Sequence, residues 1–120
     1  MEKAIVLADS YLESYEQLSN RERKTIREKI KSFAGEEKTA GFSIHPLSRA
    51  NCDESFKSAR INRDLRLIFS QQGQKYILLY VGHHDHAYRW VEGKYLNRNN
   101  FGAVYLHDSK LKVKQYYEQQ

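Results

Sequence analysis

Apolar residues near the N-terminus recur at the spacing of an amphipathic α-helix, first over residues 9–18 and again over residues 19–35. Ser19, followed along the chain by Glu22, forms a capping-box pattern that places the start of the second helix there. Gly35 supplies a stop signal for that helix. A helical hairpin with a short connection is therefore predicted. The apolar stripe of the first helix is Tyr11, Leu12, Tyr15 and Leu18, and the buried stripe of the second is Ile26, Ile30 and Phe33.

Between residues 55 and 90 the pattern changes to that of β-strands. Polar and apolar residues alternate over residues 56–61 and again over residues 65–70, with turn-forming residues at 62–64 between them. A second turn is predicted at residues 71–74, around Gly73. Residues 76–81 (YILLYV) are apolar on both faces, which is typical of a central strand. Three antiparallel strands are predicted to hold the core of the domain and its chemistry.

The flanking segments have weaker patterns. Residues 3–8 fit either a short strand or the entry to the first helix, and residues 35–53 show no clean period. We expect the latter to form a loop that Phe42, Ile44 and Leu47 pin to the core. Residues 101–107 predict one more strand, and residues 108–120 a charged tail or an isolated helix.

Composition narrows the class of protein without naming a function. The 120 residues suit one compact domain, and the net charge of +5 suits a nucleic-acid or acidic protein partner, although many ordinary domains reach it. The single cysteine, Cys52, excludes an internal disulfide framework and fits a reducing compartment. No apolar run matches a signal peptide or a membrane span, so we expect a cytoplasmic location. Walker loops, dinucleotide fingerprints, nucleophile elbows and zinc-finger spacings are absent from the sequence.

The first candidate site is a set of cations on the predicted strands: Lys57, Arg60, Arg63 and Arg66. Residues that face the same way on neighbouring antiparallel strands lie about 5 Å apart. Depending on register, Lys57 and Arg66 would meet across one face of the sheet and bind a phosphate there. The alternative is that all four are ordinary solvent-exposed strand and turn residues.

The second candidate site is the run His83, His84, Asp85 and His86, followed by Tyr88. Imidazoles exchange protons near neutral pH, and a neighbouring aspartate or tyrosine orients them. On a strand, His84 and His86 would point the same way and would suit a metal ion, but no matching remote ligands appear in the sequence. The remaining alternative is a polar loop that follows a central strand.

Two further features have open interpretations. The second predicted helix is rich in lysine and arginine, which fits either a solvated face with partial charge pairing or a surface for phosphates. Tyr88, Trp90 and Tyr95 fit either stacking on RNA bases or closure of the edge of a small core.

Taken together, the helical hairpin, the segment SARINRDLRLIF and the strand YILLYVG resemble the RelE/ParE toxin superfamily over residues 1–95. Residues 96–120 would then be a C-terminal extension. The segment VGHHDHAYRW is similar to a toxin-like domain at the front of some superfamily I DNA helicases. The resemblance implies an α+β fold in which the N-terminal helical hairpin packs on a twisted, mainly antiparallel sheet of about four strands.

The resemblance also implies a reaction, cofactor-free and metal-free cleavage of mRNA on the ribosome by attack of a ribose 2′-hydroxyl on the adjacent phosphate. It implies that Arg66 contacts the scissile phosphate, that His84 or His86 is the catalytic acid or base, that Tyr88 orients the substrate, and that Lys57 is a basic residue of the preceding strand. Together with the cations singled out by strand spacing, we expect Lys57, Arg60, Arg63 and His83 to bind RNA. One departure from the pattern of active relatives is Ala59, where a second lysine is common. Arg60 next to it should face the opposite way unless a bulge intervenes.

The same resemblance implies partners. An active toxin would act on mRNA in the ribosome and would need a cognate antitoxin protein. The alternative is a non-catalytic toxin-fold module that binds nucleic acid or protein in association with a DNA helicase. A toxin of the gyrase-poisoning ParE branch fits less well, because of the histidines.

Overall fold

The structure, a computed structural model, describes residues 4–35, 43–47, 50–98 and 104–108. Strand β1 (Ala4–Leu7) leads into helices α1 (Asp9–Glu16) and α2 (Asn20–Ala34), as the helical spacing predicted. The capping box is present, since the Ser19 hydroxyl accepts from the Glu22 N–H at 3.1 Å and the Glu22 carboxylate accepts from the Ser19 N–H at 3.0 Å. The N-terminal helical hairpin is therefore confirmed, with a strand before it.

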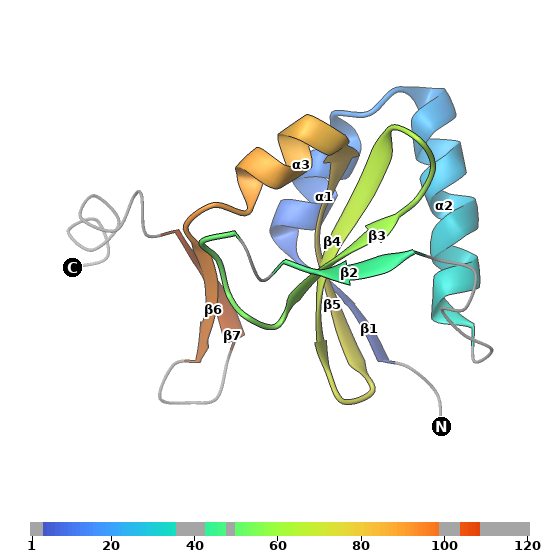
Figure 1. Cartoon of the computed structure of the whole chain (residues 1–120). Helices are drawn as coiled ribbons and strands as arrows, with labels where there is room; N and C mark the ends of the chain where they lie inside the picture. The colour runs from blue at the N-terminus through green and yellow to red at the C-terminus, as the bar shows by residue number, and fades with distance from the viewer. Residues whose placement is uncertain (1–3, 36–42, 48–49, 99–103, 109–120) are drawn as a thin grey trace.

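A five-stranded sheet forms the centre of the molecule, in the order β1-β5-β4-β3-β2 (Figure 1). Strands β3 (Phe56–Arg60), β4 (Leu65–Gln72) and β5 (Lys75–His83) are the predicted antiparallel meander. Strand β1 pairs with β5 in parallel at one edge, and β2 (Ile44–Pro46) pairs with β3 at the other. The predicted α+β class is confirmed. The expected loop over residues 35–53 is wrong at β2, whose three residues are too few to show a period.

The two faces of the sheet carry separate cores. We call the first the hairpin core, because α1 and α2 pack there, and the second the α3 core, because helix α3 (His84–Trp90) covers it. The hairpin core contains Tyr11, Leu18, Ile26, Phe33, Ala59, Ile61, Leu65, Leu67, Phe69, Tyr76, Leu78 and Val81. The α3 core contains Phe56, Ile68, Ile77, Leu79, Ala87 and Val91. The predicted anchors Ile44 and Leu47 pack against the hairpin core and the α3 core respectively, and Phe42 lies outside the described residues.

A second, two-stranded sheet lies beside the α3 core. Strands β6 (Lys94–Arg98) and β7 (Val104–Asp108) pair antiparallel, and Leu96 and Leu106 pack against that core (Figure 1). β7 covers the described part of the strand predicted at residues 101–107, whereas residues 109–120 lie outside the described residues. No helix in the described ranges has the length and apolar character needed to cross a membrane.

Candidate active site

Lys57 and Arg66 lie on opposite faces of the sheet. Lys57 is paired with Phe69, a hairpin-core residue, and its Nζ donates to Oε1 of Gln71 at 3.0 Å. Arg66 lies between Leu65 and Leu67, which both face the hairpin core, so alternation turns Arg66 to the α3 side. The predicted meeting of Lys57 and Arg66 is therefore wrong. The register pairs Lys57 with Phe69, a residue of β4 that faces the hairpin core, whereas Arg66 faces the other side.

Arg60 takes the place that was expected of Lys57. The register sets Arg60 directly opposite Arg66, so both side chains leave the same face, with Cβ atoms about 5 Å apart. Arg66 is half-buried, and its Nη1 donates to the carbonyl oxygens of Asn62 at 2.9 Å, Leu65 at 3.1 Å and Arg63 at 3.3 Å. These bonds fix the guanidinium at the β3–β4 turn. The Arg63 side chain is exposed in that turn.

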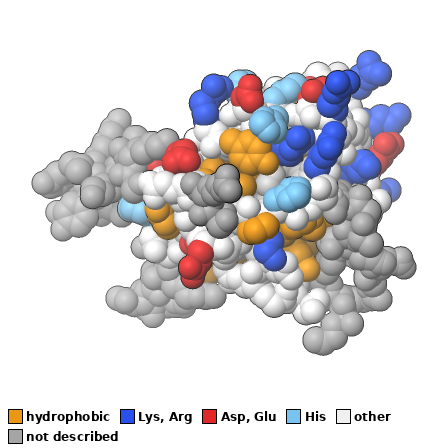
Figure 2. Space-filling view, in the orientation of Figure 1, with side chains coloured by type: hydrophobic (Ala, Val, Ile, Leu, Met, Phe, Trp, Pro, Cys, Tyr) orange, Lys and Arg blue, Asp and Glu red, His pale blue; other side chains and the backbone are white. Residues whose placement is uncertain are grey.

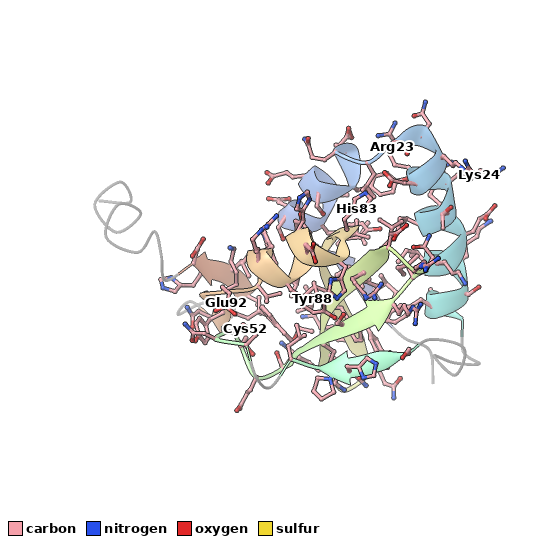
Figure 3. All side chains as sticks on the ribbon, turned by 45° about the horizontal axis from the view of Figure 1, so that its top comes forward. Arg23, Lys24, Cys52, His83, Tyr88 and Glu92 are labelled. Atoms are coloured by element: carbon pink, nitrogen blue, oxygen red, sulfur yellow. The ribbon has the colours of Figure 1, made fainter. Side chains whose placement is uncertain are left out.

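Helix α3 brings Tyr88 onto this face. The His84 N–H donates to the Asp64 carbonyl at 2.8 Å, which anchors the start of the helix to the β3–β4 turn, and Ala87 and Val91 are buried against the sheet. This anchoring directs Tyr88 at the sheet, where its hydroxyl lies 3.1 Å from Oγ of Ser58 (Figure 3). Ser58 precedes Arg60 by one repeat on the same face of β3, so Tyr88 lies beside the arginine pair.

The imidazole of His84 contacts the ring of Tyr88 and forms a hydrogen bond with a carboxylate. Its ring centroid lies 4.7 Å from that of Tyr88, nearly perpendicular at 78°. Its Nδ1 lies 2.9 Å from Oδ1 of Asp85, and this hydrogen bond lowers the pKa of the exposed Asp85 carboxyl. A carboxylate on Nδ1 selects the tautomer in which Nε2 is unprotonated and able to accept a proton. Within the described residues, no hydrogen-bond partner occupies that Nε2.

The other two histidines of the run point elsewhere. Nε2 of His83 lies 2.9 Å from Oε2 of Glu22 on α2, so the His83 side chain lies on the hairpin side of the sheet (Figure 3). Hydrogen bonding from the Ser19 backbone is the largest cause that lowers the pKa of Glu22, and the charge of His83 adds to it. The ring of His86 lies edge-on to that of His83, with centroids 6.3 Å apart. The expectation that His84 and His86 point the same way is wrong, because α3 is a helix, in which the two residues lie about 200° apart.

Sequence reasoning missed two residues of this face, Ser58 and His45. His45 is paired with Ser58 in the β2–β3 ladder and therefore leaves the sheet on the same side as Tyr88. Its Nε2 lies 3.0 Å from Oγ of Ser43. Figure 2 shows histidines and cationic side chains gathered over the sheet end near α2 and α3, and a further histidine below them. The short β2 gave no periodic signal that would have placed His45 on a face.

The described residues contain no group of three or more His, Cys, Asp or Glu side chains that could hold a metal ion. The α3 face brings together two guanidinium groups, two imidazoles and a phenol. Such a set can bind an anion and move protons.

No protein-family model matches the chain, and no curated protein matches it. Several solved structures do. The chain is similar to YafQ in the DinJ–YafQ toxin–antitoxin complex of E. coli, with a TM-score of 0.58 at 14% identity over 72% of this chain and 97% of the other. It is similar to RelE in the RelB–RelE antitoxin–toxin complex of Methanococcus jannaschii, with a TM-score of 0.57 at 14% identity over 71% and 96%.

The chain has the RelE-like toxin fold. YoeB of Staphylococcus aureus, solved as a dimer, is also similar, with a TM-score of 0.50 at 20% identity over 70% of this chain and 99% of YoeB. Nearly the whole of each RelE-like chain is therefore matched. More than a quarter of the present chain lies outside each alignment.

Proposed function

We propose that this chain is the toxin of a toxin–antitoxin system and that it cleaves mRNA on the ribosome, in the cytoplasm. Two observations support the proposal: the RelE-like fold, and the convergence of Arg60, Arg66, Tyr88 and His84 on one face of the sheet. The proposal of nuclease activity rests on the convergence of these side chains, because the same fold can host many different functions.

The proposed reaction needs a base, an acid and positive charge. The base removes the proton of a ribose 2′-hydroxyl, the 2′-oxygen bonds to the adjacent phosphorus, the bond to the 5′-oxygen breaks, and the acid protonates that leaving oxygen. Arg60 and Arg66 would bind the phosphate and stabilise the extra negative charge of the phosphorane. The products are a 2′,3′-cyclic phosphate and a 5′-hydroxyl end.

His84 is our candidate for the base, because Asp85 holds its Nδ1 and leaves Nε2 able to accept a proton. His45 is our candidate for the acid, because it leaves the same face next to Ser58. Tyr88 lies against both His84 and Ser58. Its hydroxyl would orient the substrate between the candidate base and the candidate acid. His86, whose ring lies edge-on to that of His83, and Lys57, on the far face, are less favoured than the sequence suggested.

The test uses induced expression in bacteria, with growth and the 5′ ends of translated messages as the readouts. We expect the wild type to arrest growth and cut translated mRNA. Arg60→Ala and Arg66→Ala should each lower cleavage on the order of a hundredfold, because each removes a cation from the transition-state charge. Lys57→Ala is the matched control. It removes a cation from the same strand as Arg60 but from the opposite face of the sheet, and should cleave like wild type.

Two outcomes would count against the proposal. If the wild type produces neither growth arrest nor cut messages, the chain is not a nuclease and a non-catalytic toxin-fold module becomes the better description. If Lys57→Ala loses as much activity as Arg60→Ala, the RNA does not bind on the α3 face.

A further inference from the structure

Strand β1 is an open edge of the sheet. It pairs with β5 on one side, and no described strand pairs with its other side. Val6 and Leu7 are 40% and 47% exposed, which is unusual for large apolar residues of a strand. Proteins generally protect such an edge with charges, proline or a covering segment, and a flat apolar edge is a template for another strand.

The backbone of β1 has hydrogen-bonding groups ready for that strand. The N–H groups of Ala4 and Ala8 donate to Gln74 and Leu78 on the β5 side. Because successive residues of a strand point their N–H and C=O groups to opposite sides, those of Ile5 and Leu7 point away from β5. An added strand would pair with these two residues and become the sixth of the sheet.

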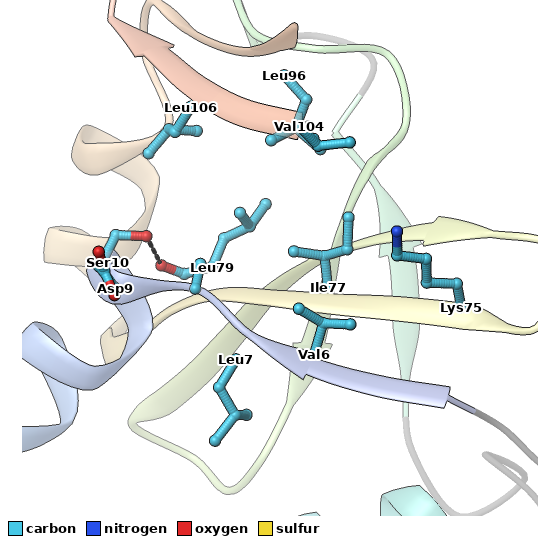
Figure 4. A pocket seen from close by; sticks show the side chains of 11 residues that line it. Val6, Leu7, Asp9, Ser10, Lys75, Ile77, Leu79, Leu96, Val104 and Leu106 are labelled. Carbon is cyan, nitrogen blue, oxygen red and sulfur yellow. Dashed lines mark hydrogen bonds between the residues drawn. The ribbon is translucent and has the colours of Figure 1, made fainter. Parts of the chain in front are cut away.

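An apolar groove flanks this edge on each face of the sheet. On the α3 side, a groove of about 700 Å³ lies between Val6, Leu79 and the β6–β7 residues Leu96 and Leu106 (Figure 4). On the hairpin side, a groove of about 570 Å³ lies between Leu7, Tyr11, Leu12 and Ile30. The side chains of an added strand would alternate between the two grooves. Its sequence should therefore be a continuous apolar run, like that of a strand buried on both faces.

Charges around the grooves select the partner. Arg27 and Lys31 line the hairpin-side groove, and Lys75 lies at one end of the other groove with Asp9 at the opposite end (Figure 4). Cations therefore outnumber the single carboxylate, and the chain as a whole carries +5. A second copy would bring like charges together across a shared edge. An acidic partner is favoured instead.

We propose that β1 binds an extended segment of an acidic partner protein, which adds a strand to the sheet and carries an apolar run flanked by aspartate or glutamate. The surface does not depend on the nuclease activity proposed above. Only the identification of the partner with an antitoxin rests on that proposed function.

The experiment measures binding of a fluorescent synthetic peptide, with a central valine, leucine and isoleucine run and glutamates at both ends, to the full chain by fluorescence anisotropy. Saturable binding is expected, together with slowed amide exchange at Ile5 and Leu7. Leu7→Pro removes an edge-facing N–H without removing a bond to β5, and should weaken binding about tenfold or more. Circular dichroism and the Tm of this variant check that its fold is intact.

Charge reversals test the partner's chemistry without touching the edge strand. Lys31→Glu should weaken binding of the glutamate-flanked peptide and strengthen that of a lysine-flanked version. Lys24→Glu, on the same helix but outside the groove lining, is the matched control and should change neither. Should the Leu7→Pro and Lys31→Glu variants bind like wild type, the docking surface is wrong. Concentration-dependent dimers that Leu7→Pro abolishes, with no peptide binding, would replace the partner by a second copy.

Discussion

Gly82 lies against the aromatic side chain of Tyr80. A Cβ at this position would lie 3.0 Å from Cε2 of Tyr80 and 3.3 Å from its hydroxyl oxygen. Tyr80 stacks on Trp90 of α3, with centroids 5.0 Å apart and planes 20° apart, and burial raises the pKa of the Tyr80 phenol. The absence of a side chain at Gly82 thus lets the last turn of α3 lie close to the sheet.

We predict that Gly82→Ala lowers the free energy of unfolding by about 1–2 kcal/mol, because Tyr80 must shift and disturb its stack with Trp90. Urea unfolding followed by far-UV circular dichroism measures the change. The control is the same substitution in a Tyr80→Ala background, where the clash is gone and the cost should largely disappear. An equal cost in both backgrounds would mean that the ring of Tyr80 does not require the glycine.

At the same scale, the alternation of residues along the strands shows which parts of the candidate site the sequence could predict. It correctly separated Lys57 from Arg60 on β3, and it correctly separated Arg66 from its leucine neighbours. It did not fix which β3 cation meets Arg66, because register depends on the turn between the strands. The turn bonded by Asn62, whose side chain accepts from the N–H groups of Asp64 and Leu65, sets that register and selects Arg60.

Among the elements, those with a long stripe, a full alternation or a continuous apolar run were predicted, whereas the three-residue strand β2 and the seven-residue helix α3 were not. Helix α2 has fifteen residues and a capping box, and β5 has a continuous apolar run. Helix α3 has seven residues, and among them only Ala87 is fully buried. Its histidines and arginine conceal the helical period. Helix α3 is stabilised by tertiary contacts with the sheet, such as that of Tyr88 with Ser58, and not by a strong local helical pattern.

Asp53 connects the elements around the α3 core. Its carboxylate accepts hydrogen bonds from the N–H and hydroxyl of Ser55, before β3, and from the N–H of Leu96 in β6, all at 2.8–2.9 Å. Burial acts to raise the pKa of Asp53, but these hydrogen bonds outweigh it and hold the pKa below its ordinary value. The charged form is therefore the one that the folded state favours.

We predict that Asp53→Asn lowers the free energy of unfolding by about 1–2 kcal/mol near pH 7, because an amide cannot accept all three bonds as well as a carboxylate. The lowered pKa stabilises the fold above the unfolded value of about 3.9, and this contribution is lost as pH falls below it toward the folded value. Urea unfolding near pH 7 and near pH 3 should show the variant and wild type converging in acid. Glu54→Gln, at an exposed carboxylate next to Asp53 in the chain, is the control. A constant difference at both pH values would contradict this account.

At the scale of the whole molecule, the C-terminal hairpin of β6 and β7 adds to the RelE-like fold. RelE-like chains are matched over 96–99% of their length, yet they cover only 70–72% of this one. The predicted division after residue 95 falls within β6. Leu96 and Leu106 pack on the α3 core, and Lys94 forms an ion pair with Asp108 at 3.2 Å. Through these contacts the hairpin packs on the core of the toxin fold. That residues 1–95 fold on their own stays a prediction.

Truncation separates the two descriptions. A chain of residues 1–95 loses β7, the Leu96 N–H that binds Asp53, and two leucines that pack against the α3 core. We therefore predict a loss of about 2–4 kcal/mol in the free energy of unfolding relative to a chain of residues 1–108. The longer chain keeps both strands and should unfold like the full protein in urea. Because Leu96 and Leu106 also line the α3-side groove beside β1, the shorter chain should bind the peptide more weakly as well. If it instead unfolds at the same urea concentration as the longer chain, the first 95 residues are a complete domain and the hairpin is an appendage on its surface.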